Sequence, residues 1–353
     1  MREPHIYRDI ISGQAGLWAG PIRGLLRAGE FFYSSAVTLR NARYDRPAAA
    51  FSSSVPVISV GNITVGGTGK TPFVIELTNR LDQLGRSPTV IARGYGAALD
   101  GPNDEELLVR RHCPGASYIS DPDRCRAVEQ AVDRLGADVI VLDDGFQHRR
   151  LARDLDIVLI DATCPFGYEH VLPRGLLREP LTGLRRAQLV AITRCDQASA
   201  TELSRIEARL GEIAPDTLVL RCRHRVTGMA RLDGTPIEEP MAGKRGILFA
   251  AIGRPQAFST TAASLGIDVV ASRWWPDHHH YRAPEIERFL NDRTLPAYDL
   301  VLTTEKDAVK LDRLAGVDAS SIRVVRIAID FLDDAGTILQ QLLERALRRE
   351  RIH

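Results

Sequence analysis

Short runs of β-branched and other apolar residues alternate along the chain with stretches in which apolar residues recur every three or four positions. The runs are typical of strands buried on both faces, and the recurring positions are typical of helices that pack one side on a sheet. Before residue 215 we predict strands over residues 55–60, 88–92, 139–142, 157–160 and 189–192. We predict helices between them over residues 70–84, 122–135 and 201–211. This alternation predicts an α/β fold with a mostly parallel sheet and helices on both faces.

The ends of two of these helices carry clear signals. Gly85 and Gly136 follow the last apolar positions, and glycine is the residue that most easily ends a helix in a left-handed conformation. At the start of helix 122–135 we predict Asp121 as the N-cap and Pro122 as the first helical residue, a position where proline is tolerated.

A second series of the same kind begins near residue 246. We predict strands over residues 247–252, 267–271, 300–303 and 324–329, and helices over residues 255–265, 284–292 and 336–349. Residues 217–238 are predicted to form two strands around the turn Asp233-Gly234. A length of 353 residues suits about two domains. We predict a larger α/β core (51–216) and a smaller C-terminal α/β domain (244–353). An amphipathic N-terminal segment (1–50) precedes the core, and a linking hairpin (217–243) joins the two domains.

Residues 15–42 combine large apolar side chains with arginines. Through residue 46 the chain has seven arginines and four acidic residues, a net charge of 7 − 4 = +3. An apolar helix face flanked by arginines suits a helix lying in a membrane interface, and it equally suits a helix packed on the protein's own core. No uninterrupted apolar stretch of about 18 residues is present, so we predict no membrane-spanning helix.

The composition argues against several classes of function. The net charge is +1, so no overall basic field favours nucleic acid as a partner. The five cysteines are odd in number and form no Cys-x-x-Cys pair, which fits a reducing compartment and predicts neither disulfides nor zinc. The N-terminus lacks the features of a secretory signal.

The clearest motif is the glycine-rich segment of residues 61–71, which ends in Gly69-Lys70-Thr71. It follows a predicted strand and opens a predicted helix, which is the context of a P-loop. Glycines in such a loop let backbone N–H groups wrap an anion at the helix N-terminus, so we predict that ATP phosphates bind residues Gly66, Gly67, Thr68, Gly69, Lys70 and Thr71. Lys70 would reach the β- and γ-phosphates, and the Thr71 hydroxyl would bind Mg²⁺. One departure from the standard pattern is Thr64, which stands where a glycine is usual.

A nucleotide site of this kind also needs a buried strand that ends in a carboxylate. The run 139–142 leads to Asp143, which would lie at the carboxyl edge of the sheet and hold Mg²⁺ directly or through water. Neighbouring Asp144 is a candidate for a second carboxylate near the metal. Together with the P-loop, this arrangement predicts an ATP- and Mg²⁺-dependent enzyme.

Two other classes of P-loop protein fit less well. Dimerising membrane ATPases have a lysine immediately before the Gly-Gly pair, where this chain has Val65. GTPases read guanine with an Asn/Thr-Lys-x-Asp motif, which Thr193-Arg-Cys-Asp196 imitates with an arginine in place of the lysine. We interpret that likeness as accidental and favour ATP over GTP.

The block Asp143-Asp-Gly-Phe-Gln-His148 resembles the hallmark of the lipid A 4′-kinase (tetraacyldisaccharide 4′-kinase) family. Further blocks similar to that family follow its order along the chain: Val60 to Pro72 with Thr64 included, Arg93-Gly-Tyr95, Asp104-Glu105, Leu172 to Pro180, Pro276-Asp-His278 and Thr303 to Asp307. The resemblance covers roughly residues 55–310 and also extends to the apolar, basic N-terminal segment.

The resemblance implies a P-loop kinase core with a smaller second domain. Its implied reaction is transfer of the ATP γ-phosphate to the 4′-hydroxyl of a tetraacylated glucosamine disaccharide 1-phosphate, a precursor of lipid A. It also implies a peripheral protein at the cytoplasmic face of the bacterial inner membrane, and we expect a monomer. A membrane-associated P-loop ATPase or GTPase switch without a sugar acceptor is the alternative.

Roles for single residues follow from the same resemblance. It implies that Asp104 is the base that accepts the hydroxyl proton and that His278 is its partner, with Glu105 as the neighbouring alternative. From the residues alone, Asp104 and its acidic neighbours suit a helix N-terminus, where carboxylates are favoured. Asn103 precedes Asp104 where the family usually has glycine. Of the run His278-His279-His280 only His278 matches the family's block, and adjacent histidines rarely bind one metal ion.

Four further residues are candidates for substrate or metal contacts. Arg178 could hold a phosphate with two parallel bonds and act in catalysis, and Glu179 could assist Mg²⁺ or fix Lys70. Arg93 and His148 could contact substrate phosphate, although a satisfied, partly buried histidine is an equal interpretation for His148. Lys306 and Asp307 could close over the nucleotide from the second domain or only brace the domain interface, and we favour the second interpretation.

Overall fold

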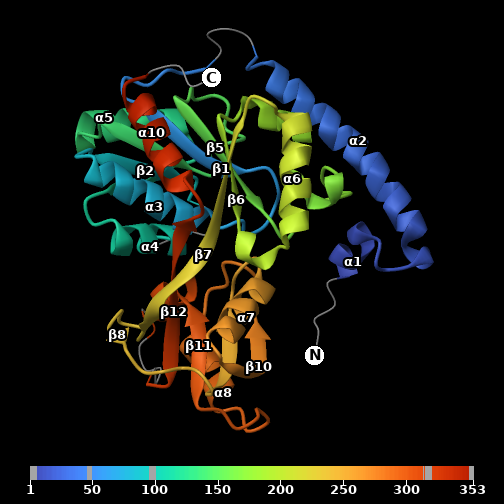
Figure 1. Ribbon diagram of the computed structural model, residues 1–353, viewed down its shortest axis with the longest axis vertical. Helices are drawn as coiled ribbons and strands as arrows, with labels where there is room; N and C mark the ends of the chain where they lie inside the picture. Colours follow the sequence, from blue (N-terminus) through green and yellow to red (C-terminus); the bar gives the residue numbers. More distant parts are fainter. Residues whose placement is uncertain (1–5, 46–49, 95–100, 313, 315–319, 350–353) are drawn as a thin grey trace. The chain divides into compact units, whose positions relative to one another are not determined.

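The computed structural model describes residues 6–45, 50–94, 101–312, 314 and 320–349 (Figure 1). The chain divides into two compact units. The first unit takes in residues 1–93, 115–223 and 330–353, and the second takes in residues 94–114 and 224–329. Strands β7 (Leu218–Ala230) and β12 (Ile322–Phe331) contain residues of both units.

The sheet of the first unit is parallel throughout its described pairs. Its strands follow the order β7-β6-β5-β1-β4-β2-β3. Their bounds are β1 Val57–Asn62, β2 Pro88–Ala92, β3 Ser117–Ser120, β4 Val139–Asp143, β5 Leu155–Asp161 and β6 Leu189–Thr193. Every residue of β1, β2, β4, β5 and β6 is buried, as expected for strands covered on both faces. The predicted α/β fold is therefore confirmed. The short, partly polar strand β3 pairs with β2 alone, and its pattern was too weak to predict.

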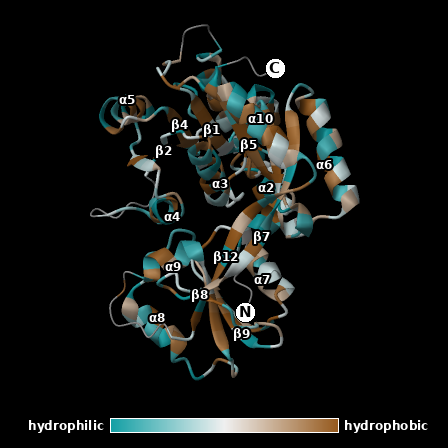
Figure 2. Ribbon diagram, turned by 60° about the vertical axis from the view of Figure 1, so that its left-hand side comes forward, coloured by the Kyte–Doolittle hydropathy of each residue, from teal (hydrophilic) through white to brown (hydrophobic). Residues whose placement is uncertain are grey.

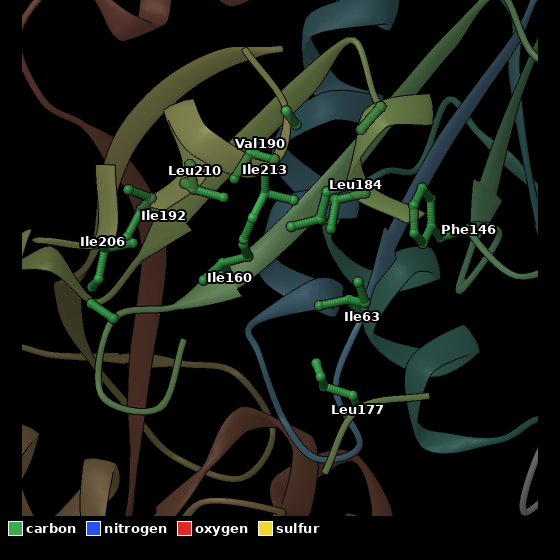
Figure 3. Close-up of a cluster of buried hydrophobic side chains, with 14 of the residues drawn as sticks. Ile63, Phe146, Ile160, Leu177, Leu184, Val190, Ile192, Ile206, Leu210 and Ile213 are labelled. Carbon is green, nitrogen blue, oxygen red and sulfur yellow. The ribbon is translucent and has the colours of Figure 1, made fainter. Parts of the chain in front are cut away.

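Helices cover this sheet and set the position of the loops between strands. They are α3 Lys70–Gln83, α5 Arg124–Leu135, α6 Ala200–Ile213 and α10 Ala335–Leu347. Ile206, Leu210 and Ile213 of α6 pack with Val190 and Ile192 of β6 in one buried cluster (Figure 3). The same cluster includes Ile63, Phe146 and Leu177, so it also fixes the segments that follow β1 and β4.

The prediction for the start of α5 was wrong by two residues. Asp123 is the N-cap, and its carboxylate accepts hydrogen bonds from the backbone N–H groups of Cys125 and Arg126. Asp121 instead accepts from Asp123 N and from the Arg126 guanidinium. Proline restricts the residue before it to extended conformations, and the first helical turn here forms after Pro122 instead of on it. At the other end, Gly136 is left-handed as predicted, with φ 65°.

The second unit has its own parallel sheet, with strands in the order β10-β9-β11-β12. Its further elements are α4 Asp104–His112, β8 Pro236–Ile237, β9 Arg245–Ala250, α7 Pro255–Ser264, β10 Asp268–Trp274, α8 Ala283–Leu290, β11 Leu300–Thr304 and α9 Glu305–Leu311. Strand β8 pairs antiparallel with the end of β7, which confirms two strands around Asp233-Gly234. In Figure 2 strand β9 carries mostly the hydrophobic colour, which agrees with its burial from Gly246 to Ala250.

The N-terminal residues form α1 (Ile6–Ser12), a short 3-10 turn (Leu17–Ala19) and the long helix α2 (Gly20–Ala42). Polar side chains of α2 tie it to the first unit: Glu30 accepts from Val171 N at 2.8 Å and Tyr33 donates to Arg178 O at 3.2 Å. Most of its large apolar residues are nevertheless exposed, with Leu25 at 75% and Phe32 at 73%. Of the apolar residues of α2 whose burial is described, Val37 is buried, so most of the apolar face is not used for packing on the protein's own core. Among the described residues, no helix combines the length and the apolar character needed to cross a bilayer.

Gly61 in β1 lies close to Phe146, in the segment that follows β4. A Cβ atom added there would lie 2.6 Å from Phe146 Cβ and 2.7 Å from Phe146 N. We expect Gly61→Ala to lower the free energy of unfolding by roughly 1–3 kcal/mol, because the crowded atoms include backbone. Gly211→Ala in α6 is the matched control: a Cβ there meets nothing within 4 Å, and it should raise the free energy by roughly 0.5–1 kcal/mol. Urea unfolding measures both, and equal stability of the two variants would contradict the packing described here.

Candidate active site

The P-loop lies between β1 and α3, in the context that the sequence predicted. Gly66 and Gly69 have φ values of 112° and 90°, which side-chain-bearing residues rarely adopt. Gly69 is the N-cap of α3, so the loop runs directly into the N-terminus of a 14-residue helix. Backbone N–H groups and the positive end of the helix dipole together make this a site for phosphate.

Lys70 is held by two acceptors from different segments. Its Nζ lies 3.4 Å from Asn62 Oδ1 and 3.4 Å from Asp144 Oδ1. The Asn62 amide also donates to Thr64 O at 2.7 Å, so one side chain fixes both the lysine and the loop backbone. Thr64, which stands where the standard motif has glycine, forms an isolated antiparallel β-bridge with Leu177.

Asp143 is the last residue of β4, which pairs with β1, and Asp144 follows it directly. Asp143 is buried and pairs in register with Val60 of β1. Asp144 has φ 53° and accepts two hydrogen bonds from Arg178 Nη1, at 2.8 and 3.0 Å. Burial alone would raise the pKa of Asp144, but the charges of Lys70 and Arg178 lower it below the ordinary value. The carboxylate is therefore ionised and neutralises part of the charge of two cations.

Glu179 is fully engaged by donors other than Lys70. Its buried carboxylate accepts from Asn41 Nδ2 at 3.2 Å, from Gln147 Nε2 at 3.0 Å and from Arg186 Nη2 at 2.9 Å. The Glu179 carboxylate thereby connects Asn41 of α2, Gln147 in the segment after β4, and Arg186. This arrangement favours a bracing role for Glu179 and leaves the fixing of Lys70 to Asn62 and Asp144.

The oxygen donors near the P-loop fit a magnesium ion. Thr71 in the first turn of α3 and Asp143 at the end of β4 offer a hydroxyl and a carboxylate. Mg²⁺ prefers oxygen ligands and usually keeps several waters and substrate phosphates, so it needs few protein ligands. In the part of the chain that the structure describes, no group of three or more His, Cys, Asp or Glu side chains could hold a metal ion by itself.

Two further candidates lie in the same unit. Arg93 directly follows β2, at the carboxyl end of that strand. His148 is partly buried; its burial and the charges of Arg124 and Arg153 lower its pKa to about 4. His148 is therefore neutral at physiological pH and can act toward a phosphate only as a neutral N–H donor.

A second cluster lies in the second unit and is built around Asp104. Asn103 caps α4 by accepting from Glu106 N at 2.7 Å, which makes Asp104 the first residue of the helix. The Nδ1 atom of His278 lies 3.2 Å from both carboxylate oxygens of Asp104. Both interpretations of Asp104 thus hold: it begins a helix, and it pairs with His278.

Two lysines surround the same carboxylate. Lys306 Nζ lies 3.7 Å from Asp104 Oδ2, 3.4 Å from His278 Nε2 and 3.1 Å from Asp277 Oδ1. Lys310 Nζ lies 3.9 Å from Asp104 Oδ2 and 3.0 Å from Asp307 Oδ1. The sequence favoured a bracing role for Lys306 and did not single out Lys310. Both lysines lie on the short helix α9, which is distant from Asp104 in sequence, so no local pattern indicated these contacts.

The charges of this cluster shift its pKa values. Burial alone would raise the pKa of Asp104, but the His278 hydrogen bond and the charge of Lys306 lower it to about 2. The hydrogen bond from Asp104 raises the pKa of His278, against the effects of its burial and of Lys306. Both shifts favour an ionised carboxylate beside a protonated imidazole.

The other histidines of the run have different partners. His279 Nε2 donates to the Glu285 carboxylate at 2.9 Å, and its ring stacks on Trp275, with ring centroids 6.0 Å apart. His278 and His279 therefore bind different carboxylates, Asp104 and Glu285.

Comparison with known proteins gives consistent matches over most of the chain. The sequence profile described as "LpxK: Tetraacyldisaccharide-1-P 4'-kinase" matches residues 22–347. The tetraacyldisaccharide 4′-kinase of Anaeromyxobacter dehalogenans (strain 2CP-1) is 40% identical over 96% of each chain. That of Syntrophus aciditrophicus is 39% identical over 82% of this chain and 85% of its own. The crystal structure of LpxK from Aquifex aeolicus in complex with ATP has a TM-score of 0.70 and 26% identity, covering 92% of this chain and 99% of that one.

The titration of His278 tests the second cluster. Asp104→Asn should lower the pKa of His278, because the hydrogen bond and charge that raise it are lost. Lys306→Met should raise the same pKa, since the ammonium group opposes protonation of the imidazole. NMR titration of the ring protons measures both shifts, with His278→Gln to assign the signal among nine histidines. Shifts in the same direction would contradict the described coupling.

Proposed function

The chain belongs to the tetraacyldisaccharide-1-phosphate 4′-kinase family, and from this premise we propose how its residues divide the work of the reaction. The enzyme is an ATP-dependent phosphotransferase of lipid A biosynthesis. It transfers the γ-phosphate of ATP to the 4′-hydroxyl of a tetraacyl glucosamine disaccharide 1-phosphate.

The observation that carries the assignment of roles is the hydrogen-bonded pair of Asp104 and His278. A nucleotide switch that activates water has no need of a carboxylate prepared for a sugar hydroxyl. A buried carboxylate in contact with a histidine and two lysines suits a kinase that must accept one proton from an alcohol. The pair therefore favours the kinase over the membrane-associated ATPase or GTPase.

In the first unit, the P-loop amides of residues Gly66 to Thr71 bind the ATP phosphates. Lys70 and Arg178 both contact Asp144. We propose that phosphate oxygens replace this carboxylate as their partner, so that both cations stabilise the charge on the transferred group. Asp144 then serves as the counter-ion that keeps Lys70 and Arg178 in place between turnovers.

Thr71 and Asp143 are the residues that would hold Mg²⁺, which would help to neutralise the phosphate charge when bound. Asp144 and Glu179 were predicted as further metal ligands. Because cations and amides already engage both carboxylates, we propose that they act by positioning Lys70, Arg178 and the segment around them.

Asp104 is proposed as the base. As the 4′-oxygen attacks the γ-phosphorus, its proton passes to a carboxylate oxygen of Asp104, and ADP leaves with the electron pair of the broken P–O bond. A carboxylate with a low pKa suffices, because phosphoryl transfer depends mainly on positioning and charge stabilisation. His278 and Lys306 hold Asp104 ionised and oriented for this step. Arg93 and His148 remain proposed contacts for substrate phosphate.

We further propose that the protein acts at the cytoplasmic face of the inner membrane through α2. Polar contacts of Glu30, Tyr33 and Asn41 attach the helix to the first unit, while its large apolar side chains stay exposed. Together with the net charge of +3 through residue 46, this suits an interfacial helix over anionic lipid. All residues to which we assign roles lie on one chain, so a monomer is proposed as the working unit.

Transfer of radiolabelled γ-phosphate from ATP to the tetraacyl disaccharide 1-phosphate in mixed micelles tests the division of roles. Asp104→Asn should lower the rate of transfer by roughly 10²–10⁴-fold and leave ATP binding nearly unchanged. Lys70→Ala should lower it by roughly 10²–10³-fold through lost charge stabilisation. Loss of ATP binding in Asp104→Asn would show a structural role instead. Release of free phosphate by the wild type without labelled lipid would support the ATPase.

Vesicle sedimentation tests the membrane proposal. The triple variant Leu25→Ser, Phe31→Ser, Phe32→Ser should lose most binding to phosphatidylglycerol-containing vesicles, because all three side chains are exposed on α2. Leu135→Ser removes an exposed leucine away from α2 and is the matched control. Equal binding by the triple variant and the control would refute the role of this helix.

A further inference from the structure

Thr193 and Arg194, at the end of β6, contact the backbone of the P-loop. The Thr193 hydroxyl donates to Thr68 O at 2.9 Å and lies 3.4 Å from Ile160 O. Arg194 Nη1 donates to Gly67 O at 3.1 Å. Thr193 is fully buried and Arg194 is 7% exposed, so water does not compete freely for these bonds.

Arg194 is itself fixed from two directions. Its backbone has φ 55°, which is uncommon for an arginine, and its guanidinium forms a buried ion pair with Asp161 at the end of β5. Asp161 also accepts from Thr163 N at 2.9 Å and from Thr163 Oγ1 at 2.7 Å. Strands β5 and β6 pair here, with Asp161 opposite Thr193. The guanidinium thus contacts Gly67 from the carboxyl ends of two paired strands, where Asp161 holds it in place.

The contacts with carbonyl oxygens have a consequence for the amides. In a planar trans peptide the C=O of one residue and the N–H of the next point in opposite directions. A fixed Gly67 carbonyl therefore fixes the direction of the Thr68 N–H, and a fixed Thr68 carbonyl fixes that of the Gly69 N–H. Both carbonyls are held toward the protein interior, so both N–H groups point away from it, as phosphate binding by a P-loop requires.

We infer that Thr193 and Arg194 are positioning residues that hold the P-loop amides ready for the phosphates of ATP. The first two residues of Thr193-Arg-Cys-Asp196, whose likeness to a guanine motif we interpret as accidental, thus contact the backbone of the P-loop. The inference deepens the proposed function and rests on ATP binding in the first unit.

Thr193→Val provides the sharpest test, because it replaces the hydroxyl by a methyl group of similar size. Thr193→Ser keeps the hydroxyl and is the matched control. Calorimetry with a non-hydrolysable ATP analogue and Mg²⁺, and separately with pyrophosphate, should show affinity for both ligands lowered roughly 2- to 12-fold in Thr193→Val. Thr193→Ser should restore most of the affinity. In steady-state assays the KM for ATP should rise, with the KM for the lipid acceptor unchanged.

The outcomes are distinguishable. A wild type that fails to bind the ATP analogue would overturn the nucleotide-binding role on which the inference rests. Wild-type affinity in Thr193→Val would overturn the inference and leave the kinase assignment intact. An altered preference between ATP and GTP with unchanged pyrophosphate affinity would show a base-reading segment instead.

Arg194 needs a second variant, because Arg194→Met alone would leave Asp161 buried without its cation. The double variant Arg194→Met, Asp161→Asn removes both charges together and should weaken pyrophosphate binding to a similar extent. Thermal unfolding without nucleotide separates a folding defect from a loss of positioning. A folded double variant with full pyrophosphate affinity would contradict the role of Arg194.

Discussion

The contact of Asp144 with Lys70 and Arg178 is the interaction on which the nucleotide half of the enzyme depends. Two partly buried cations would repel each other, and a single carboxylate between them makes their proximity tolerable. The three residues follow β1, β4 and a segment distant from both, so their meeting requires each segment to be fixed. Asn62, Glu179 and Arg194 do this by binding backbone or side chains around the loop.

In the second unit, too, buried charged groups are stabilised by groups of opposite charge, but there the central group is an anion surrounded by cations. Here a buried carboxylate, Asp104, is surrounded by the imidazole of His278 and two lysines. In both clusters counter-ions hold the charged groups in place. Such preorganisation means that little reorganisation is required when charge moves during phosphoryl transfer.

Helix α2 links the exposed apolar surface to this framework. Tyr33 donates to the carbonyl of Arg178, and Asn41 donates to the carboxylate of Glu179. The polar side chains of the helix therefore contact the segment that carries Arg178, and most of its large apolar side chains stay exposed.

The sequence by itself determined the parallel α/β sheet, the P-loop between strand and helix, and the nature of the oxygen donors beside it. These features depend on local periodicity and on glycines at positions where the backbone must be left-handed. They can therefore be predicted without tertiary information. The tertiary structure decided which charges meet. Lys306 and Lys310 reach Asp104 across about 200 residues of chain, and Arg194 reaches Gly67 across 127. It also decided that Asp123, and not Asp121, caps α5, because the competing bond to Arg126 engages Asp121. No local pattern encodes such pairings, since each depends on where folding brings distant segments together.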